Sequence, residues 1–220
     1  MGLSVVTGAN RGIGLELCRQ LRQRGADVVA VCRKPSTELE ALGVRIASGI
    51  DVCDAAAPER LAAALGGTPI DLLVHNAGIL RHEELASLDV ASIRAQFETN
   101  ALAPLRLTAA LLPALHEGSK IAVVSSLMGS VGDNGSGGAY GYRMSKATLN
   151  IAAVSLARDL ARRRIWVGIL HPGFVRTGMT GNAGNVEPAD AARGLLARID
   201  ALGPETTGRF FHQTGKELPW

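Results

Sequence analysis

The chain has 220 residues, of which 47% are hydrophobic and 20% are charged, and this is the size and apolar content of one globular domain or at most two small ones. Such a composition excludes an intrinsically disordered chain, and 26 glycines without a three-residue period exclude a collagen-like fibre. The formal net charge of only +3 is too small for a nucleic-acid-binding face and favours an anionic small ligand.

Short apolar segments alternate with longer helical patterns along the chain. In the helical patterns, apolar residues recur at four-residue spacing, as at Ile13, Leu17 and Leu21, which is typical of helices with one buried face. We therefore predict an α/β fold of the Rossmann type: a doubly wound, mostly parallel seven-stranded sheet with helices on both faces, formed by residues 1–220 as a single domain. The predicted strands are 3–7, 26–32, 44–50, 71–75, 120–125, 165–171 and 209–213, and further helices are predicted around 105–115 and 149–160.

A glycine-rich turn directly follows the first predicted strand. Segment 8–14 reads Gly-Ala-Asn-Arg-Gly-Ile-Gly and leads into a helix, so it presents backbone N–H groups and the positive end of that helix to an anion such as a pyrophosphate. The spacing differs from Gly-x-Gly-x-x-Gly, and a tight turn without a ligand is the alternative. Leu15 and Glu16 occupy the positions of the Lys and Ser or Thr of a Walker loop, which excludes that motif. The candidate phosphate-binding residues are Gly8, Asn10, Arg11, Gly12, Ile13 and Gly14.

The second predicted strand ends in a basic residue. An enzyme that uses NAD is expected to place an Asp or Glu there, against the 2′-hydroxyl of the adenosine ribose. Here the residue is Arg33, whose guanidinium can bind a 2′-phosphate that an acid would repel. Together with Arg11 beside the glycines, this predicts NADP (NADPH) as cofactor. The alternative is that Arg33 is only a solvent-exposed residue at the end of the strand and binds no ligand.

Three further features of the sequence limit the class of protein and the position of its ligand site. The three cysteines, Cys18, Cys32 and Cys53, include no Cys-x-x-Cys pair, which argues against a disulfide framework or a zinc ribbon and predicts a reducing, cytoplasmic environment. Apolar runs shorter than roughly 18 residues and the absence of a signal-peptide pattern predict neither a membrane span nor export. The Gly/Ser-rich stretch 129–138 lies just past a strand end, so we expect it at the rim of a ligand site.

A tyrosine and a lysine lie four residues apart near the start of a helical pattern. Tyr142 and Lys146 therefore share one helix face, where an ammonium could depress the pKa of the phenol toward a range useful for proton transfer. Tyr140 has Met144 at the same offset, so it is not the equivalent candidate. The pair predicts an acid–base site.

With these residues the chain resembles the short-chain dehydrogenase/reductase family over nearly its whole length. Six ordered motifs at compatible spacing are far more specific than any one of them. The finer pattern, including Gly-Lys-Glu-Leu-Pro-Trp at 215–220, is most similar to the small carbonyl reductase and C-factor branch. The motifs are segment 7–14, Asp51-Val52, Asn76-Ala77-Gly78 with Asn100, Ser125-Ser126, segment 142–146 and segment 172–177.

The resemblance implies a role for each catalytic candidate. Tyr142 would protonate the carbonyl oxygen during reduction, and Lys146 would hold the nicotinamide ribose and lower the tyrosine pKa. Ser126, in preference to Ser125, would orient the substrate carbonyl, and Asn100 would anchor a water of the proton relay. Hydride transfer from the nicotinamide would then depend on orientation and charge stabilisation.

The resemblance also implies the remaining cofactor contacts. Asp51, followed by Val52, would hold the adenine amino group, and Asn76, Ala77 and Gly78 would form the wall beside the adenosine. Thr177 would bind the carboxamide. The candidate residues that accompany it after the sixth predicted strand are Pro172, Gly173 and Val175.

Two segments depart from the family pattern. Sixteen positions separate Ser126 from Tyr142, about three more than the family leads us to expect, so the rim loop 130–138 is elaborated and its substrate contacts cannot be transferred. Segment 177–185 is short and contains three glycines, which predicts a small, mobile lid over an open pocket.

The sequence therefore predicts an NADP-dependent short-chain alcohol dehydrogenase or carbonyl reductase that converts small apolar or aromatic ketones and aldehydes to alcohols, and the reverse. No two of the five histidines have a metal-ligand spacing, so no metal is expected. No nucleic-acid or membrane partner is expected either, and a homodimer is compatible with the sequence. A sugar-nucleotide epimerase shares Tyr-x-x-x-Lys but needs a larger substrate domain. A cofactor-bound signalling or redox-sensing protein with little catalytic role is the other alternative, against which the joint presence of Ser126, Tyr142 and Lys146 argues.

Overall fold

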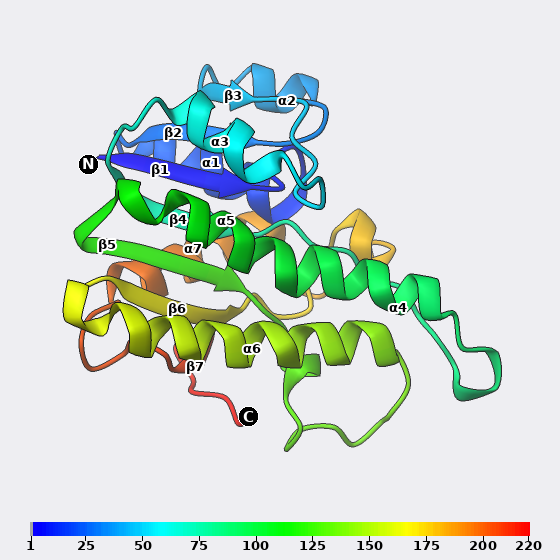
Figure 1. Cartoon of the computed structure of the whole chain (residues 1–220). Coiled ribbons are helices and arrows are strands. Elements are labelled where there is room, and N and C mark those ends of the chain that lie inside the picture. Colours follow the sequence, from blue (N-terminus) through cyan, green and yellow to red (C-terminus); the bar gives the residue numbers. More distant parts are fainter. Residues whose placement is uncertain (1) are drawn as a thin grey trace.

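Seven parallel strands form one twisted sheet at the centre of a computed structural model that describes residues 2–220 (Figure 1). Their order is β3-β2-β1-β4-β5-β6-β7, so the winding direction reverses between β1 and β4. All seven predicted strands are confirmed, and every pair is parallel. The strands are β1 (Leu3–Thr7), β2 (Asp27–Val31), β3 (Arg45–Ala47), β4 (Ile70–His75), β5 (Leu115–Val124), β6 (Trp166–His171) and β7 (Phe210–His212).

Helices cover both faces of this sheet, as the predicted doubly wound fold requires (Figure 1). One face carries α1 (Gly12–Gln23), α2 (Thr37–Glu40) and α7 (Pro188–Asp200). The opposite face carries α3 (Ala57–Leu65), α5 (Ala103–Leu111) and α6 (Tyr140–Leu160). Helix α4 (Val90–Phe97) leads through a π-helical turn, Glu98–Leu102, into α5 and packs along α6.

The alternation of side chains along the strands divides the core into two apolar layers. Val5 of β1 faces the layer under α3, α5 and α6, and its neighbour Val6 faces the layer under α1 and α7. Both side chains are fully buried. Strands that are buried on both faces read as continuous apolar runs, which is why the sequence indicated them so directly.

Some element bounds differ from those predicted. Strand β3 has three residues instead of seven and is partly exposed, because it lies at the edge of the sheet and pairs only with β2. The helix predicted to reach residue 115 ends at Leu111, and Leu115 already begins β5. Pro113, in the short 3₁₀ turn between them, lacks the N–H that would continue the helix. Across residues 2–220 no helix combines the length and apolar content that a bilayer crossing needs.

Candidate functional site

A cleft of about 790 Å³ opens at the carboxyl edge of the sheet, around the point where the strand order reverses. Open α/β sheets bind their ligands at such a reversal. Most of the residues predicted for a dinucleotide lie in its wall. They are Gly8, Asn10, Arg11, Gly12, Ile13, Arg33, Asp51, Val52, Asn76, Ala77, Gly78, Tyr142, Lys146, Pro172 and Thr177.

The glycine-rich turn exposes main-chain N–H groups at the N-terminus of α1. Gly8 and Gly12 adopt φ angles of 66° and 55°, which L residues with a side chain rarely adopt. Gly14 does not line the cleft. A Cβ at Gly14 would lie 2.3 Å from the Gly8 carbonyl oxygen and 2.5 Å from Nδ2 of Asn76. Gly14 therefore allows α1 to approach the turn closely and so sets the position of the free N–H groups.

The segment after β4 is hydrogen-bonded to this turn. The N–H groups of Asn76 and Ala77 both donate to Oγ1 of Thr7 over 3.1 Å. Nδ2 of Asn76 donates to the carbonyl oxygens of Thr7 and Gly8, over 3.0 and 3.1 Å. These four bonds fix the two predicted cofactor segments relative to each other.

Basic side chains gather at the β2 end of the cleft. Arg33 is exposed and lies 3.7 Å from the carboxylate of Asp51. Lys34 and Arg11 also line the cleft. Lys34 was not among the predicted site residues, although it follows Arg33 directly. An anion bound here would meet several cations and a single carboxylate.

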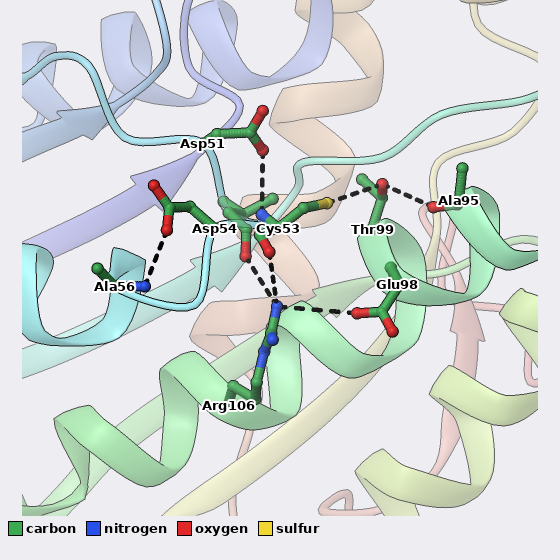
Figure 2. A network of polar contacts seen from close by, with 9 residues as sticks. Asp51, Cys53, Asp54, Ala56, Ala95, Glu98, Thr99 and Arg106 are labelled. Carbon is green, nitrogen blue, oxygen red and sulfur yellow. Dashed lines mark hydrogen bonds and ion pairs between the residues drawn. The ribbon is translucent and has the colours of Figure 1, made fainter.

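A polar network holds the Asp51–Cys53 turn against α4 and α5 (Figure 2). The Cys53 N–H donates to Oδ1 of Asp51 over 3.0 Å, and Sγ of Cys53 lies 3.1 Å from Oγ1 of Thr99. Arg106 donates to the Cys53 carbonyl oxygen over 3.2 Å. Burial raises the pKa of the Cys53 thiol, so this cysteine is not an activated nucleophile at neutral pH.

Tyr142 and Lys146 lie in the first two turns of α6, as their spacing predicted. Their side chains are 8% and 5% exposed, and both border the cleft. Nζ of Lys146 lies 5.8 Å from the centroid of the Tyr142 ring and donates to the Val124 carbonyl oxygen over 2.8 Å. The end of β5 thus holds the ammonium beneath the ring.

The pKa of the phenol differs from the sequence-based expectation. Burial raises the pKa of Tyr142 above its ordinary value, and the neighbouring Ser126 hydroxyl opposes this only in part. Burial also lowers the pKa of Lys146 to about 8. In the chain itself the net shift of the phenol pKa is therefore upward and not downward, because spacing along a helix carries no information about desolvation.

The two serines after β5 have different partners. Ser126 lies close enough to Tyr142 for its hydroxyl to lower the pKa of the phenol, and its Oγ accepts the Met128 N–H over 3.2 Å. Ser125 donates to Oδ1 of Asn150 over 2.5 Å. The pocket wall includes Ser125 but not Ser126, yet of the two only the Ser126 hydroxyl affects the pKa of the phenol. Of the two, Ser126 shares a polar cluster with the tyrosine.

Asn100 lies in the π-helical turn between α4 and α5 and is fully buried. Its Nδ2 donates to the Ile79 carbonyl oxygen and to Oγ of Ser145, each over 2.9 Å, and its Oδ1 accepts the Ile79 N–H over 2.8 Å. Ser145 in turn donates to the Tyr142 carbonyl oxygen over 2.8 Å. The side-chain N–H groups of Asn100 are both engaged within the protein, so this side chain links the loop after β4 to α6.

The segment after β6 places only some of its predicted residues in the cleft. Pro172 and Thr177 line it, whereas Val175 is 3% exposed and forms a bridge with Val186. Gly173 has a φ of 86°, and its main role is to allow close packing against Val186. Thr180 donates to the Val175 carbonyl oxygen over 2.7 Å, which ties the predicted lid segment to the bridge between Val175 and Val186.

Several lining residues were not predicted from the sequence. Ser125 and Arg176 lie within two of the motifs, and Gly178 and Met179 lie in the predicted lid segment, whereas the others reach the cleft through tertiary packing. A direct signal existed only for those adjacent to predicted residues. The additional residues are Val31, Cys32, Lys34, Ile50, Cys53, Ile79, Arg81, Ala95, Thr99, Val124, Ser125, Arg176, Gly178, Met179 and Pro188. Within the part of the chain that the structure describes, no three His, Cys, Asp or Glu side chains gather in a way that could hold a metal ion.

Comparison with known sequences matches this chain to a protein family and to individual relatives. The family model described as short chain dehydrogenase matches residues 3–187. The 1-hydroxy-2-glutathionyl-2-methyl-3-butene dehydrogenase of Rhodococcus sp. is 42% identical over the full length of both chains. The C-signal protein of Myxococcus xanthus is 45% identical over 69% of this chain and 93% of its own length.

Solved structures with this architecture include carbonyl reductases. An NADPH-bound carbonyl reductase from chicken fatty liver superposes with a TM-score of 0.91 at 30% identity and covers 100% of this chain and 98% of its own. A carbonyl reductase from Pseudomonas aeruginosa in complex with NADP has a TM-score of 0.84 at 34% identity and covers 100% of both chains. The family match, the near-complete overlap with these proteins and the grouping of Ser126, Tyr142 and Lys146 together show that this chain belongs to the short-chain dehydrogenase/reductase family of oxidoreductases.

Proposed function

We propose that residues 1–220 act as one catalytic domain that reduces small ketones and aldehydes with NADPH and catalyses the reverse oxidation of the alcohols. The observation that carries this proposal is the convergence of Ser126, Tyr142 and Lys146 at one end of a cleft whose other end is basic. The three side chains can bind and polarise a carbonyl oxygen, and the basic end can bind a phosphorylated dinucleotide.

The wall of the cleft fits such a cofactor. The turn at Gly8 and Gly12 offers main-chain N–H groups to a pyrophosphate at the start of α1. Arg33, Arg11 and Asp51 line the cleft; the two arginines would bind the 2′-phosphate, and Asp51 would hold the adenine. Thr177 lies next to Gly12 and would contact the carboxamide end. NADPH, when bound, supplies the hydride, which the side chains of this chain cannot provide.

The proton step is assigned to the tyrosine. Because burial keeps the pKa of Tyr142 high, its hydroxyl retains its proton at neutral pH and can donate it to a carbonyl oxygen that becomes negative. Ser126 would donate a second hydrogen bond to that oxygen and hold it in place. Lys146 would bind the ribose hydroxyls and place a positive charge beneath the phenol, and Asn100 would support the site through Ser145.

The pH dependence follows from the lysine. The pKa of Lys146 is lowered to about 8, so the side chain is charged below that pH and loses its charge as the pH rises through it. We expect kcat/KM for carbonyl reduction to be nearly level through the neutral range and to fall on the alkaline side with an apparent pKa near 8. Initial rates in constant-ionic-strength buffers measure this. A profile that rises through that region would contradict the assignment.

The choice between the two nicotinamide cofactors gives another test. Because Arg33 and Arg11 can bind a 2′-phosphate, NADPH is expected to bind at least about tenfold more tightly than NADH, which is about 1.4 kcal/mol. Arg33→Ala should remove most of this difference by weakening NADPH binding alone. Titration of both nucleotides by fluorescence measures it, and equal affinities for the unmodified chain would refute the cofactor assignment.

A signalling role is the second candidate, favoured by the 45% identity to the C-signal protein. The two proposals differ in turnover. A panel of aliphatic and aromatic aldehydes and ketones should be reduced with stoichiometric consumption of NADPH if the chain is a reductase. Tight NADPH binding with no turnover of any member of the panel would favour the signalling role instead.

A further inference from the structure

We infer that Glu83 is a positioning residue that caps the N-terminus of α6 and thereby sets the place of Tyr142. The inference deepens the proposed function and rests on Tyr142 being the proton donor. Glu83 lies in the loop after β4 and is 3% exposed. It is absent from the wall of the cleft, so it would act through α6 and not by touching substrate or cofactor.

The carboxylate of Glu83 is surrounded by hydrogen-bond donors. Its Oε1 accepts Oγ of Ser92 over 2.6 Å and Nε2 of Gln96 over 2.5 Å, both from α4. Its Oε2 accepts the Gly141 N–H over 3.0 Å. Among residues 2–220 no Lys, Arg or His forms an ion pair with this carboxylate. Instead, three hydrogen-bond donors and the positive N-terminal end of the 21-residue helix α6 offset the free-energy cost of burying the carboxylate.

The start of α6 has no cap within its own sequence. Ala139, the residue before the helix, makes no side-chain cap and has a left-handed backbone with φ of 46°. Gly137 and Gly138 before it also have positive φ values. Glu83 supplies what is missing, since its carbonyl oxygen accepts the Ala139 N–H over 3.2 Å and its carboxylate accepts the Gly141 N–H. A distant loop thus fixes the first turn of the catalytic helix.

Close packing makes this arrangement specific. A Cβ at Gly141 would lie 2.5 Å from Nε2 of Gln96 and 3.0 Å from Cα of Ile93, so α6 approaches α4 as nearly as a glycine allows. Gly141 immediately precedes Tyr142. A small movement of this turn would therefore displace the phenol from Ser126, and a misplacement of about 1 Å can lower a rate by roughly a hundredfold.

Glu83→Gln tests the inference with little change in volume. Only one of the two terminal atoms of an amide is an acceptor, and the other is an NH2 donor, so the amide cannot accept from Gly141 with one atom and from the α4 side chains with the other. We expect kcat for carbonyl reduction to fall about tenfold to a hundredfold, with NADPH affinity within about twofold of the unmodified chain. Amide hydrogen exchange at residues 140–143 should become faster. Glu84→Gln is the matched control, because Glu84 is exposed and its side chain makes no hydrogen bond within the described residues.

The double variant Glu83→Gln/Gln96→Glu provides a rescue. It restores one carboxylate and one amide between the loop and α4, so the amide oxygen at position 83 is free to accept the Gly141 N–H. We expect kcat to return to within about threefold of the unmodified chain and exchange at 140–143 to slow again. If Glu83→Gln kept its kcat, or lost only thermal stability, or if the swap left kcat low, the inference would be overturned. Hydrogen exchange reports on the cap even in a chain that turns over no carbonyl, which would refute the proposed function separately.

Discussion

Replacement of Tyr142 by phenylalanine is expected to lower turnover at least about a hundredfold. The substitution keeps the ring that packs at the start of α6 and removes only the hydroxyl, which lies beside Ser126. Without that hydroxyl, no acid is held at the position of the carbonyl oxygen. NADPH affinity should barely change, because the ring and the rest of the cleft remain. Steady-state kinetics and nucleotide titration measure the two quantities separately.

Tyr140→Phe is the internal control for this experiment. Tyr140 begins α6, two residues before Tyr142, and its i+4 neighbour is Met144 instead of a lysine. Its loss should leave turnover within about threefold of the unmodified chain. If Tyr142→Phe retained near-normal turnover and Tyr140→Phe lost it, the assignment of the acid would be refuted.

Lys146→Ala is expected to damage both binding and chemistry. The ammonium lies under the Tyr142 ring, 5.8 Å from its centroid, and is held by the Val124 carbonyl oxygen. Its removal deletes the charge that would favour the phenolate and the donor that would bind the ribose. We expect kcat/KM to fall at least about a hundredfold and NADPH affinity to fall about tenfold.

The matched control is Lys120→Ala. Lys120 is also partly buried with a lowered pKa, and its Nζ donates to the carbonyl oxygens of Ile199 and Asp200. It does not line the cleft. This variant should lose thermal stability without a loss of kcat/KM in the folded fraction. Equal losses of kcat/KM in the two variants would mean that the Lys146 effect is not specific to the site.

Local patterns were sufficient to predict the fold and the position of the cleft. Strands buried on both faces appear as unbroken apolar runs, and the turn at Gly8 and Gly12 follows one of them at once. The pair Tyr142 and Lys146 is separated by a single helical turn, so their common face could be inferred from spacing alone.

Features that depend on tertiary packing could not be predicted. The hydrogen bonds of Glu83 join residues that lie 9, 13 and 58 positions away, and no short motif records such a contact. Likewise, the contact of Cys53 with Thr99 spans 46 positions. The raised pKa of Tyr142 depends on burial by the whole fold, which the four-residue spacing could not reveal.

The central claim is that this chain reduces a carbonyl with NADPH and uses Tyr142 as the proton donor. A single-turnover experiment with enzyme in excess over NADPH and a saturating carbonyl substrate tests it most directly, with NADPH loss and alcohol formation followed together. The unmodified chain should form one alcohol for each NADPH consumed, and Tyr142→Phe should bind NADPH equally well but convert it at least about a hundredfold more slowly. Full NADPH binding without alcohol formation in the unmodified chain, or equal rates in both chains, would contradict the account.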